Sequence, residues 1–301
     1  MMPARRSIAV VGLGNIGAAV AASIAAAGRH DLVACVRTAI DHLVLERSEG
    51  EVCVALRSTT DPREVDPVDW VLLCTKFHQT PSTQPWLASL LGPQTRVAVL
   101  QNGIGQTAAV REVAPGARVV PAIVYYNGER VPPDRVRMRH VGPEDLAVQD
   151  DADGRDFAEL LAGTFLSVGL VDDFVTRAWR KLLLNIVANP ITALTLQRQA
   201  VLRHPDVHRL GLALVEEAAH VGRAEGARLD ADIADQTLAT LLTYPPGVGT
   251  SMYFDRLASR PLEAEALTGS VVRAGIRHGL PTPINSALLA LLRAISDAAE
   301  N

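Results

Sequence analysis

The stretch VGLGNIG at residues 11–17 restricts the fold of this chain more than any other feature. Gly12, Gly14 and Gly17 match the spacing G-x-G-x-x-G, directly after the apolar run SIAVVG and before an Ala-rich stretch that ends at Gly28. A strand, turn and helix with this glycine spacing form the fingerprint of dinucleotide-binding folds. The first glycine permits a tight turn, the second lets a pyrophosphate approach the backbone, and the third allows close helix–strand packing. The predicted dinucleotide-binding residues are Gly12, Leu13, Gly14, Asn15, Ile16 and Gly17.

The end of the next strand, DLVACV, indicates which dinucleotide binds. NAD enzymes usually carry Asp or Glu there to bind the ribose hydroxyls, whereas this chain has Arg37 and Thr38. The nearby acids are Asp31, at the wrong end of the strand, and Asp41, several residues beyond it. Arg37 can pair with a 2′-phosphate, which predicts NADPH/NADP as the cofactor. The alternative is that Arg37 is only a solvated loop charge.

The first half of the chain alternates strand-like and helix-like segments. DWVLLC, TRVAVL and RVVPAIVYY repeat the strand signal, with helical stretches near residues 83–91 and 105–114. Strands that are apolar on both faces are typical of a parallel sheet covered by helices. Residues 41–57 interrupt this pattern and predict an inserted hairpin around residues 48–51. Two further strands, RVRMRHV and DLAVQ, and a helix over about residues 154–167 complete this half.

Beyond about residue 171 the apolar residues recur with the helical period alone. PDVHRLGLALVEEAAHVGRAEG, ADIADQTLATLL, PLEAEALTGSVVRAGIRHG and INSALLALLRAI all show this period, with Pro and Gly at their ends. We therefore predict an α/β protein with two domains. Residues 1–171 form an N-terminal NADP-binding Rossmann-type parallel sheet domain, and residues 172–301 form an all-α C-terminal domain.

Composition excludes several classes of partner. The net charge of −4, with Lys and Arg dispersed along 301 residues, gives no basic tract for nucleic acid. No run of about 18 apolar residues is free of Gly, Pro and charge, so we expect no membrane partner. The three cysteines, Cys35, Cys53 and Cys74, suit reduced, buried thiols better than disulfides or a zinc site. We accordingly expect no metal and a cytoplasmic location.

Polar residues follow two strands where each predicted strand ends. Lys76 and Gln79 follow one strand in VLLCTKFHQ, and Asn102 follows the next in VAVLQNGIGQ. Ligands of open parallel sheets bind at the carboxyl ends of strands, which makes these three residues candidates for cofactor binding. Asn-Gly is also an ordinary turn and Lys an ordinary loop residue, so position alone leaves both interpretations open.

The stretch WRKLLLNIVANPITAL, residues 179–194, predicts a buried helix with one polar stripe. Lys181, Asn185 and Asn189 recur at every fourth position, about 40° apart around the helix. Asn is a poor helix former and an exposed face would favour charged residues, so the stripe indicates hydrogen bonding to a ligand. The alternative is the solvent face of an amphipathic helix. Pro190 predicts a kink or break at the end of the stripe.

Taken together, these motifs resemble the ketopantoate (2-dehydropantoate) 2-reductase family, NADPH enzymes of pantothenate synthesis. The resemblance runs through VGLGNIG, LLCTKFHQ, QNGIG, residues 179–194, GTSMYFDRLASRPLEAEALTG and RHGLPTP. It implies a Rossmann-type domain joined to a helical domain, with the active site in the cleft between them. It also implies an NADP-dependent oxidoreductase that acts on CH–OH and reduces a small anionic 2-oxo acid, ketopantoate, to pantoate in pantothenate and CoA biosynthesis.

The resemblance assigns roles to single residues. The family's catalytic lysine falls on Lys181 and its active-site glutamate on Glu263. Without the resemblance, Glu263 would be interpreted as an acid in the first turn of a helix after Pro261, and Glu265 is a competing carboxylate. The residues implied for the substrate are Asn102, Asn185, Asn189 and Ser251, and those implied for the cofactor outside the glycine turn include Arg37, Lys76 and Asn102.

Two departures from the family pattern leave the oxo acid open. Tyr125 and Tyr126 stand where members commonly have a Thr-Thr-His-like segment, and Val248 stands where relatives place an Asn. A reductase of a different, bulkier 2-oxo acid or related carbonyl is therefore the alternative function, and a non-catalytic NADP-binding sensor is the third. Retention of Lys181 with the family's other site residues argues against the sensor. The apolar helical half is compatible with a homodimer interface and equally with a self-contained core.

Overall fold

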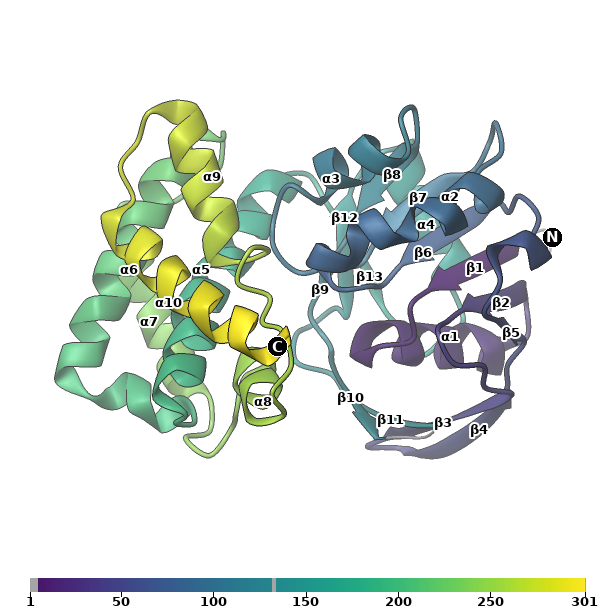
Figure 1. The fold of residues 1–301 in the computed structure, drawn as a ribbon, viewed down its shortest axis with the longest axis horizontal. Coiled ribbons are helices and arrows are strands. Elements are labelled where there is room, and N and C mark those ends of the chain that lie inside the picture. Colours follow the sequence, from purple (N-terminus) through teal and green to yellow (C-terminus); the bar gives the residue numbers. More distant parts are fainter. Residues whose placement is uncertain (1–4, 132–133, 301) are drawn as a thin grey trace. The chain divides into compact units, whose positions relative to one another are not determined.

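The computed structural model describes residues 5–131 and 134–300. The chain divides into two compact units, Met1–Asp172 and Asp173–Asn301, hereafter unit 1 and unit 2. Unit 1 is built on a parallel sheet, and every regular element in the described part of unit 2 is a helix (Figure 1). The predicted fold class, a Rossmann-type sheet followed by helices, is confirmed.

The main sheet of unit 1 has six strands, all parallel, in the order β5-β2-β1-β6-β7-β8. If the hairpin β3–β4 is set aside as an insertion, this is the order 3-2-1-4-5-6 of doubly wound dinucleotide-binding sheets. The order reverses between β1 and β6, so ligands are expected beyond the carboxyl ends of these two strands. The bounds are β1 Ser7–Val11, β2 Asp31–Cys35, β5 Ser58–Thr59, β6 Trp70–Leu73, β7 Arg96–Val99 and β8 Arg118–Pro121.

Helices cover both faces of the main sheet. On one face, Leu87 and Leu90 of α2 and Val110 of α3 pack into a buried cluster with β6 and β7. On the other face, Ile24 of α1 and Phe157 of α4 join a second buried cluster. The bounds are α1 Asn15–Ala27, η1 Pro62–Glu64, η2 Phe77–Thr83, α2 Gln84–Leu90, α3 Gln106–Val113 and α4 Ala152–Leu161.

A second sheet, in the order β10-β11-β3-β4, lies on the other side of α1 (Figure 1). The predicted hairpin is present, because β3 and β4 pair antiparallel up to Arg47 and Gly50. Cys53 is exposed, contrary to the expectation of buried thiols, because alternate residues of the edge strand β4 face solvent. The bounds are β3 His42–Arg47, β4 Gly50–Ala55, β10 Asn127–Val131 and β11 Arg135–Arg139.

A third sheet, β13-β12-β9, departs from the sequence prediction. The run RVVPAIVYY is two short strands, β8 in the main sheet and β9 Ile123–Val124 in the third sheet, instead of one strand. The helix predicted to reach residue 167 ends at Leu161, and Gly163 follows with a positive φ of +77° that a helix does not adopt. The chain then forms an unpredicted strand, β13 Val168–Val171, beside β12 Leu146–Gln149.

Unit 2 packs its helices around α5, which contacts α6, α7, α8 and α10. The predicted break at Pro190 is absent, since α5 continues to Thr195. Pro190 removes one backbone hydrogen bond, and the helix is buried on both sides of it, at Ile186 and Ile191. The bounds are α5 Phe174–Thr195, η3 Gln199–Arg203, α6 Pro205–Ala224, α7 Ile233–Thr243, α8 Ser251–Leu257, α9 Thr268–His278 and α10 Pro283–Glu300. Among the described residues, no helix has the length and apolarity needed to span a membrane.

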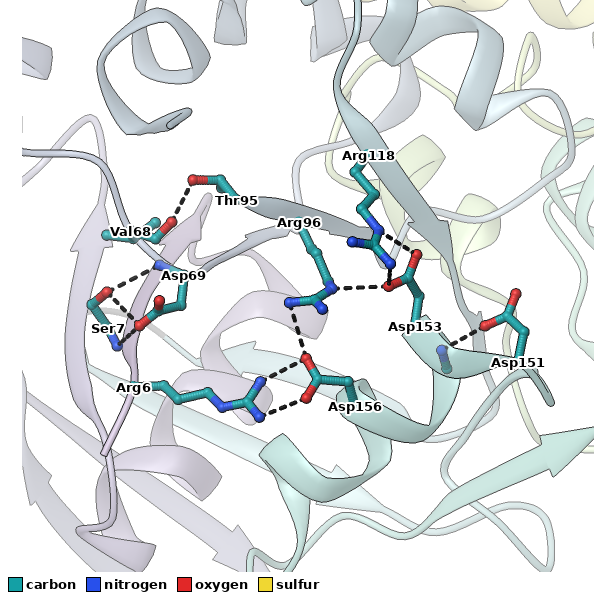
Figure 2. A network of polar contacts seen from close by, with 11 residues as sticks. Arg6, Ser7, Val68, Asp69, Thr95, Arg96, Arg118, Asp151, Asp153 and Asp156 are labelled. Atoms are coloured by element: carbon teal, nitrogen blue, oxygen red, sulfur yellow. Dashed lines mark hydrogen bonds and ion pairs between the residues drawn. The ribbon is translucent and has the colours of Figure 1, made fainter. Parts of the chain in front are cut away.

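An ion-pair network ties α4 to the amino ends of the main-sheet strands (Figure 2). Arg6, just before β1, donates hydrogen bonds of 2.6 and 2.5 Å to the two oxygens of Asp156. Arg96 of β7 lies 3.1 Å from Asp156 and 2.9 Å from Asp153, which also pairs with Arg118 of β8 at 2.5 Å. Two carboxylates of α4 therefore fix the starting points of three strands.

We expect Asp156→Asn to lower the free energy of unfolding at pH 7 by about 2 kcal/mol, because Arg6 and Arg96 lose a shared, largely buried carboxylate. The hydrogen bond from Arg6 lowers the pKa of Asp156 in the folded protein, against the opposing effect of burial. Its contribution is therefore complete above the ordinary pKa of an aspartate and is lost as pH falls through the lowered value. In urea unfolding, the difference in free energy of unfolding between wild type and Asp156→Asn should be smaller at acid pH than at pH 7.

Asp31→Asn is the matched control. Its carboxylate pairs with Arg5 while both side chains are about two-thirds exposed, at 65% and 64%, so its loss should leave urea unfolding unchanged. Equal effects of the two variants would contradict the special role of the α4 network.

Candidate functional site

The glycine turn after β1 has two glycines that the fold itself requires and one that it does not. Gly12 has a φ of +92° and donates its N–H to the carbonyl of Cys35 at 3.0 Å. A Cβ on Gly17 would overlap the Gly12 carbonyl oxygen and lie 2.9 Å from the Cβ of Cys74. A Cβ on Gly14 would meet nothing within 4 Å. Packing within the protein therefore does not require a glycine at position 14, and the space beside its Cα is open.

The first turn of α1 offers donors to an anion. The helix begins at Asn15, its N-cap Gly14 supplies no side-chain hydrogen bond, and no acidic residue lies in the first turn. The first N–H groups of a helix have no partner within the helix, and the aligned peptide dipoles place positive charge there. This end of α1 therefore suits a pyrophosphate.

Arg37 lies just beyond β2, exposed to solvent and with no hydrogen bond or ion pair to any residue the structure describes. The two acids that the NAD alternative would need are occupied elsewhere. Asp31 pairs with Arg5 at 2.6 Å, and Asp41 contacts His42 at 2.6 Å. The geometry therefore suits a 2′-phosphate and supplies no carboxylate for ribose hydroxyls.

Two loops beside the glycine turn are joined through buried glutamines. The Nε2 of Gln101 donates to the hydroxyls of Thr75 and Thr80 at 3.2 and 3.1 Å. The Nε2 of Gln106 donates to the carbonyls of Gln101 and Gly103 at 3.1 and 2.5 Å. The sequence prediction missed both glutamines, although a polar residue directly after the apolar run VAVL was an available signal.

These glutamines hold the segment that carries Lys76 beside the segment that carries Asn102. Lys76 precedes η2, and its own N–H is accepted by the Oε1 of Gln79 at 3.2 Å. The N–H of Gln79 returns to the carbonyl of Lys76 at 2.9 Å. Gln79 thus shapes the turn that presents Lys76, and its predicted contact with the cofactor stays a prediction.

In unit 2, the polar stripe of α5 reaches the start of α8. Asn189 is 6% exposed, and its Oδ1 accepts hydrogen bonds from the Ser251 hydroxyl at 3.1 Å and the Met252 N–H at 3.3 Å. Its Nδ2 donates to the Oδ1 of Asn185 at 3.4 Å. Three predicted substrate residues, Asn185, Asn189 and Ser251, are therefore brought together, and Asn189 also positions Ser251.

A second contact between α5 and α8 was not predicted. The hydroxyl of Thr192, which is fully buried, lies 2.7 Å from the hydroxyl of Thr250. Thr250 is the N-cap of α8 and accepts the Tyr253 N–H at 3.1 Å. Sequence alone gave no signal for this pair, because a buried helical Thr commonly bonds only its own helix, as Thr192 also does to Ala188.

Lys181, the first residue of the stripe, has a perturbed ionisation. Burial lowers the pKa of Lys181 to about 8, and the negative charge of Glu263 opposes that lowering. Glu263 lies outside any helix, because α9 begins only at Thr268; the predicted helix start at Pro261 is wrong. The N–H of Leu262 donates to the Ser296 hydroxyl of α10 at 3.0 Å, which ties this segment to α10.

The competing carboxylate, Glu265, is committed elsewhere. Its oxygens accept hydrogen bonds from Arg273 at 2.5 Å and from Arg293 of α10 at 2.6 Å. An acid held between two guanidinium groups is a structural tie between helices. Glu263 is therefore the better candidate for the acidic partner of Lys181.

The residues that depart from the family pattern have structural partners. Tyr126 is fully buried and its hydroxyl donates to the carbonyl of Ile16 at 2.8 Å. The N–H of Tyr125 donates to the Asp145 carbonyl at 2.7 Å, and the carbonyl of exposed Val248 accepts from the Gln199 N–H at 2.9 Å. Tyr126 thus supports the start of α1 and gives no reason to expect a bulkier substrate.

Comparison with known proteins agrees with this geometry. Sequence profiles described as "Ketopantoate reductase PanE/ApbA" and "Ketopantoate reductase PanE/ApbA C terminal" match residues 8–152 and 173–296. A 2-dehydropantoate 2-reductase from Caulobacter vibrioides is 40% identical over 288 residues, 96% of this chain and 98% of the relative. The resemblance seen in the sequence is confirmed across both units.

Solved structures of similar proteins also match nearly the whole chain. A PanE/ApbA family ketopantoate reductase from Ralstonia eutropha has a TM-score of 0.88 and 29% identity, covering 98% of this chain and 100% of that one. A dimeric ketopantoate reductase from Staphylococcus aureus has a TM-score of 0.86 and 27% identity, covering 97% and 99%.

The different roles of the two glycines can be tested without a ligand. We expect Gly17→Ala to destabilise the protein by about 1–3 kcal/mol, because its methyl group overlaps the Gly12 carbonyl and forces α1 away from the turn. Gly14→Ala should leave the thermal unfolding midpoint unchanged, because its φ of −72° suits alanine and the space is open. Loss of stability in Gly14→Ala alone would contradict the assignment.

Proposed function

The chain belongs to the ketopantoate reductase family and is an NADP-dependent oxidoreductase acting on CH–OH, and we propose how its own residues reduce 2-dehydropantoate to pantoate. The observation that carries the proposal is the ionisation of Lys181. Burial lowers the pKa of its amine to about 8, and the charge of Glu263 favours the protonated form and opposes this lowering. An amine in this condition suits proton donation to a carbonyl oxygen.

The residues of unit 1 fit NADPH. The open space at Gly14 and the uncapped start of α1 suit its pyrophosphate, and Arg37 suits its 2′-phosphate. We propose Lys76 and Asn102 as further contacts, held in register by Gln101 and Gln106. When bound, NADPH supplies the hydride that the carbonyl carbon receives.

Lys181 supplies the proton in this proposal. As the carbonyl carbon becomes tetrahedral, negative charge grows on its oxygen, and the Nζ of Lys181 donates a hydrogen bond to that oxygen and then transfers a proton. The product gains one hydride and one proton, and Lys181 regains its proton from water. With a pKa of about 8, the amine is mostly protonated at neutral pH yet a stronger acid than an ordinary lysine.

The remaining site residues orient the substrate. Glu263 keeps Lys181 charged by attraction, and we assign Ser251 and Asn102 to the carboxylate end of the substrate. Asn185 and Asn189 are assigned to its hydroxyl end. The Oδ1 of Asn189 already accepts two hydrogen bonds and its Nδ2 gives one hydrogen to Asn185, so the second Nδ2 hydrogen is assigned to a substrate oxygen.

Assembly and location complete the proposal. We propose a homodimer, in line with the Staphylococcus aureus reductase whose structure is described as dimeric. We propose a cytoplasmic location, which suits three cysteines without disulfides.

Steady-state oxidation of NADPH with ketopantoate and a panel of bulkier 2-oxo acids tests the function. We expect ketopantoate to give the highest kcat/KM. A higher kcat/KM for another acid would support the alternative substrate, and NADPH binding without turnover of any acid would support the sensor.

The ionisation of Lys181 predicts a pH profile. Because the protonated amine is the active form and its pKa is about 8, kcat/KM should stay level below that pH and fall as pH rises through it. Lys181→Ala should lose on the order of a hundredfold in kcat, and its residual rate should lack the inflection. Glu265→Gln is the matched control, because its carboxylate binds Arg273 and Arg293, and its profile should follow the wild type. An unchanged inflection in Lys181→Ala would contradict the assignment.

A further inference from the structure

Residues 126–130 form hydrogen bonds to the glycine turn that is proposed to bind the pyrophosphate. Tyr126 donates its hydroxyl to the carbonyl of Ile16 at 2.8 Å. The N–H of Arg130 donates to the Oδ1 of Asn15 at 2.9 Å, and its Nη1 donates to the carbonyl of Leu13 at 3.0 Å. The three fingerprint positions that are not glycine after Gly12, namely 13, 15 and 16, are therefore all held by one short segment.

Close backbone packing accompanies these hydrogen bonds. Gly128, the second residue of β10, lies against the backbone of Asn15, and a Cβ there would overlap the Asn15 carbonyl oxygen and lie 2.8 Å from the carbonyl carbon. One edge of β10 pairs with β11, and its other side meets the start of α1 (Figure 1). The sheet β10-β11-β3-β4 thus contacts the glycine turn through β10.

The hydrogen bonds from Tyr126 and Arg130 favour binding of an anion at the first N–H groups of α1. Two of the three donors go to backbone carbonyls, those of Leu13 and Ile16, and the third goes to the side-chain Oδ1 of Asn15. These bonds use only oxygens, so they leave the first N–H groups of α1 for a ligand. Arg130 is half-buried, so its positive charge is screened less than that of a fully exposed arginine, and the charge of Asp134 offsets part of it.

We propose that Arg130, together with Tyr126 and Gly128, is a positioning element of the dinucleotide site and that Arg130 raises affinity for the pyrophosphate part of the cofactor. This rests on the proposed function, since the ligand is NADPH. Arg130 acts through the turn and touches no reacting atom. In this proposal Tyr126, which departs from the family pattern, contributes to cofactor binding and does not determine which substrate is reduced.

Direct titration of NADPH by its fluorescence, without substrate, tests the proposal. Arg130→Met keeps the backbone hydrogen bond to Asn15 but removes the bond to Leu13 and the charge, so Kd for NADPH should rise on the order of tenfold. Arg130→Lys should recover part of this loss, and kcat at saturating NADPH should stay within about twofold of the wild type in both variants.

Arg137→Met is the matched control. Arg137 lies on β11 in the same sheet, opposite Glu129 of β10, and its guanidinium pairs with Glu46 at 2.5 Å instead of the turn. Its Kd for NADPH should equal that of the wild type. Gly128→Ala is a second test that keeps the charge, and it should also raise Kd because β10 must move off Asn15.

NADH, which lacks the 2′-phosphate, locates the effect within the cofactor. Arg130→Met should weaken NADPH and NADH by the same factor, whereas Arg37→Met should weaken only NADPH. An unchanged Kd in Arg130→Met, or an equal loss in Arg137→Met, would overturn the inference and leave the function standing. Failure of the wild type to bind NADPH would overturn the proposed function itself.

Discussion

The contact between Gly17 of α1 and the carbonyl of Gly12 sets the arrangement of unit 1. Because no Cβ fits at Gly17, α1 lies closer to β1 than any other residue would allow, with its first turn directly after the strand. This closeness lets the same helix pack on the main sheet and on the sheet β10-β11-β3-β4. It also aims the positive end of α1 at the switch point between β1 and β6, where an open parallel sheet binds its ligand.

The parts of the fold that sequence predicts are those whose signal is local. The apolar runs of β1, β6 and β7 are buried on both sides, so each reads as a strand without reference to its neighbours. β9 and β13 are short and both pair with β12, from which β9 is separated by β10 and β11 and β13 by α4.

The candidate site likewise contains residues that a local sequence pattern predicts and residues that depend on distant partners. The periodicity of Lys181, Asn185 and Asn189 marks a polar stripe because all three lie on one helix. The choice between Glu263 and Glu265 is beyond periodicity, since it depends on Arg293 of α10 taking one of the two carboxylates. Gln101 was overlooked for a related reason, since a buried glutamine gains meaning only when its partners are known.

The opposing influences on Lys181 explain why the site needs both burial and an acid. Burial alone lowers the pKa of an amine, and a sufficiently buried lysine is neutral at pH 7 and has no proton to donate. A strongly paired lysine keeps its proton but releases it reluctantly, because the pKa of the amine is then high. With burial as the larger effect and Glu263 as the weaker, opposing one, the pKa of Lys181 settles at about 8. A general acid works best when its pKa lies near the working pH, so the balance between these two effects, and not the lysine by itself, makes the residue suited to its task.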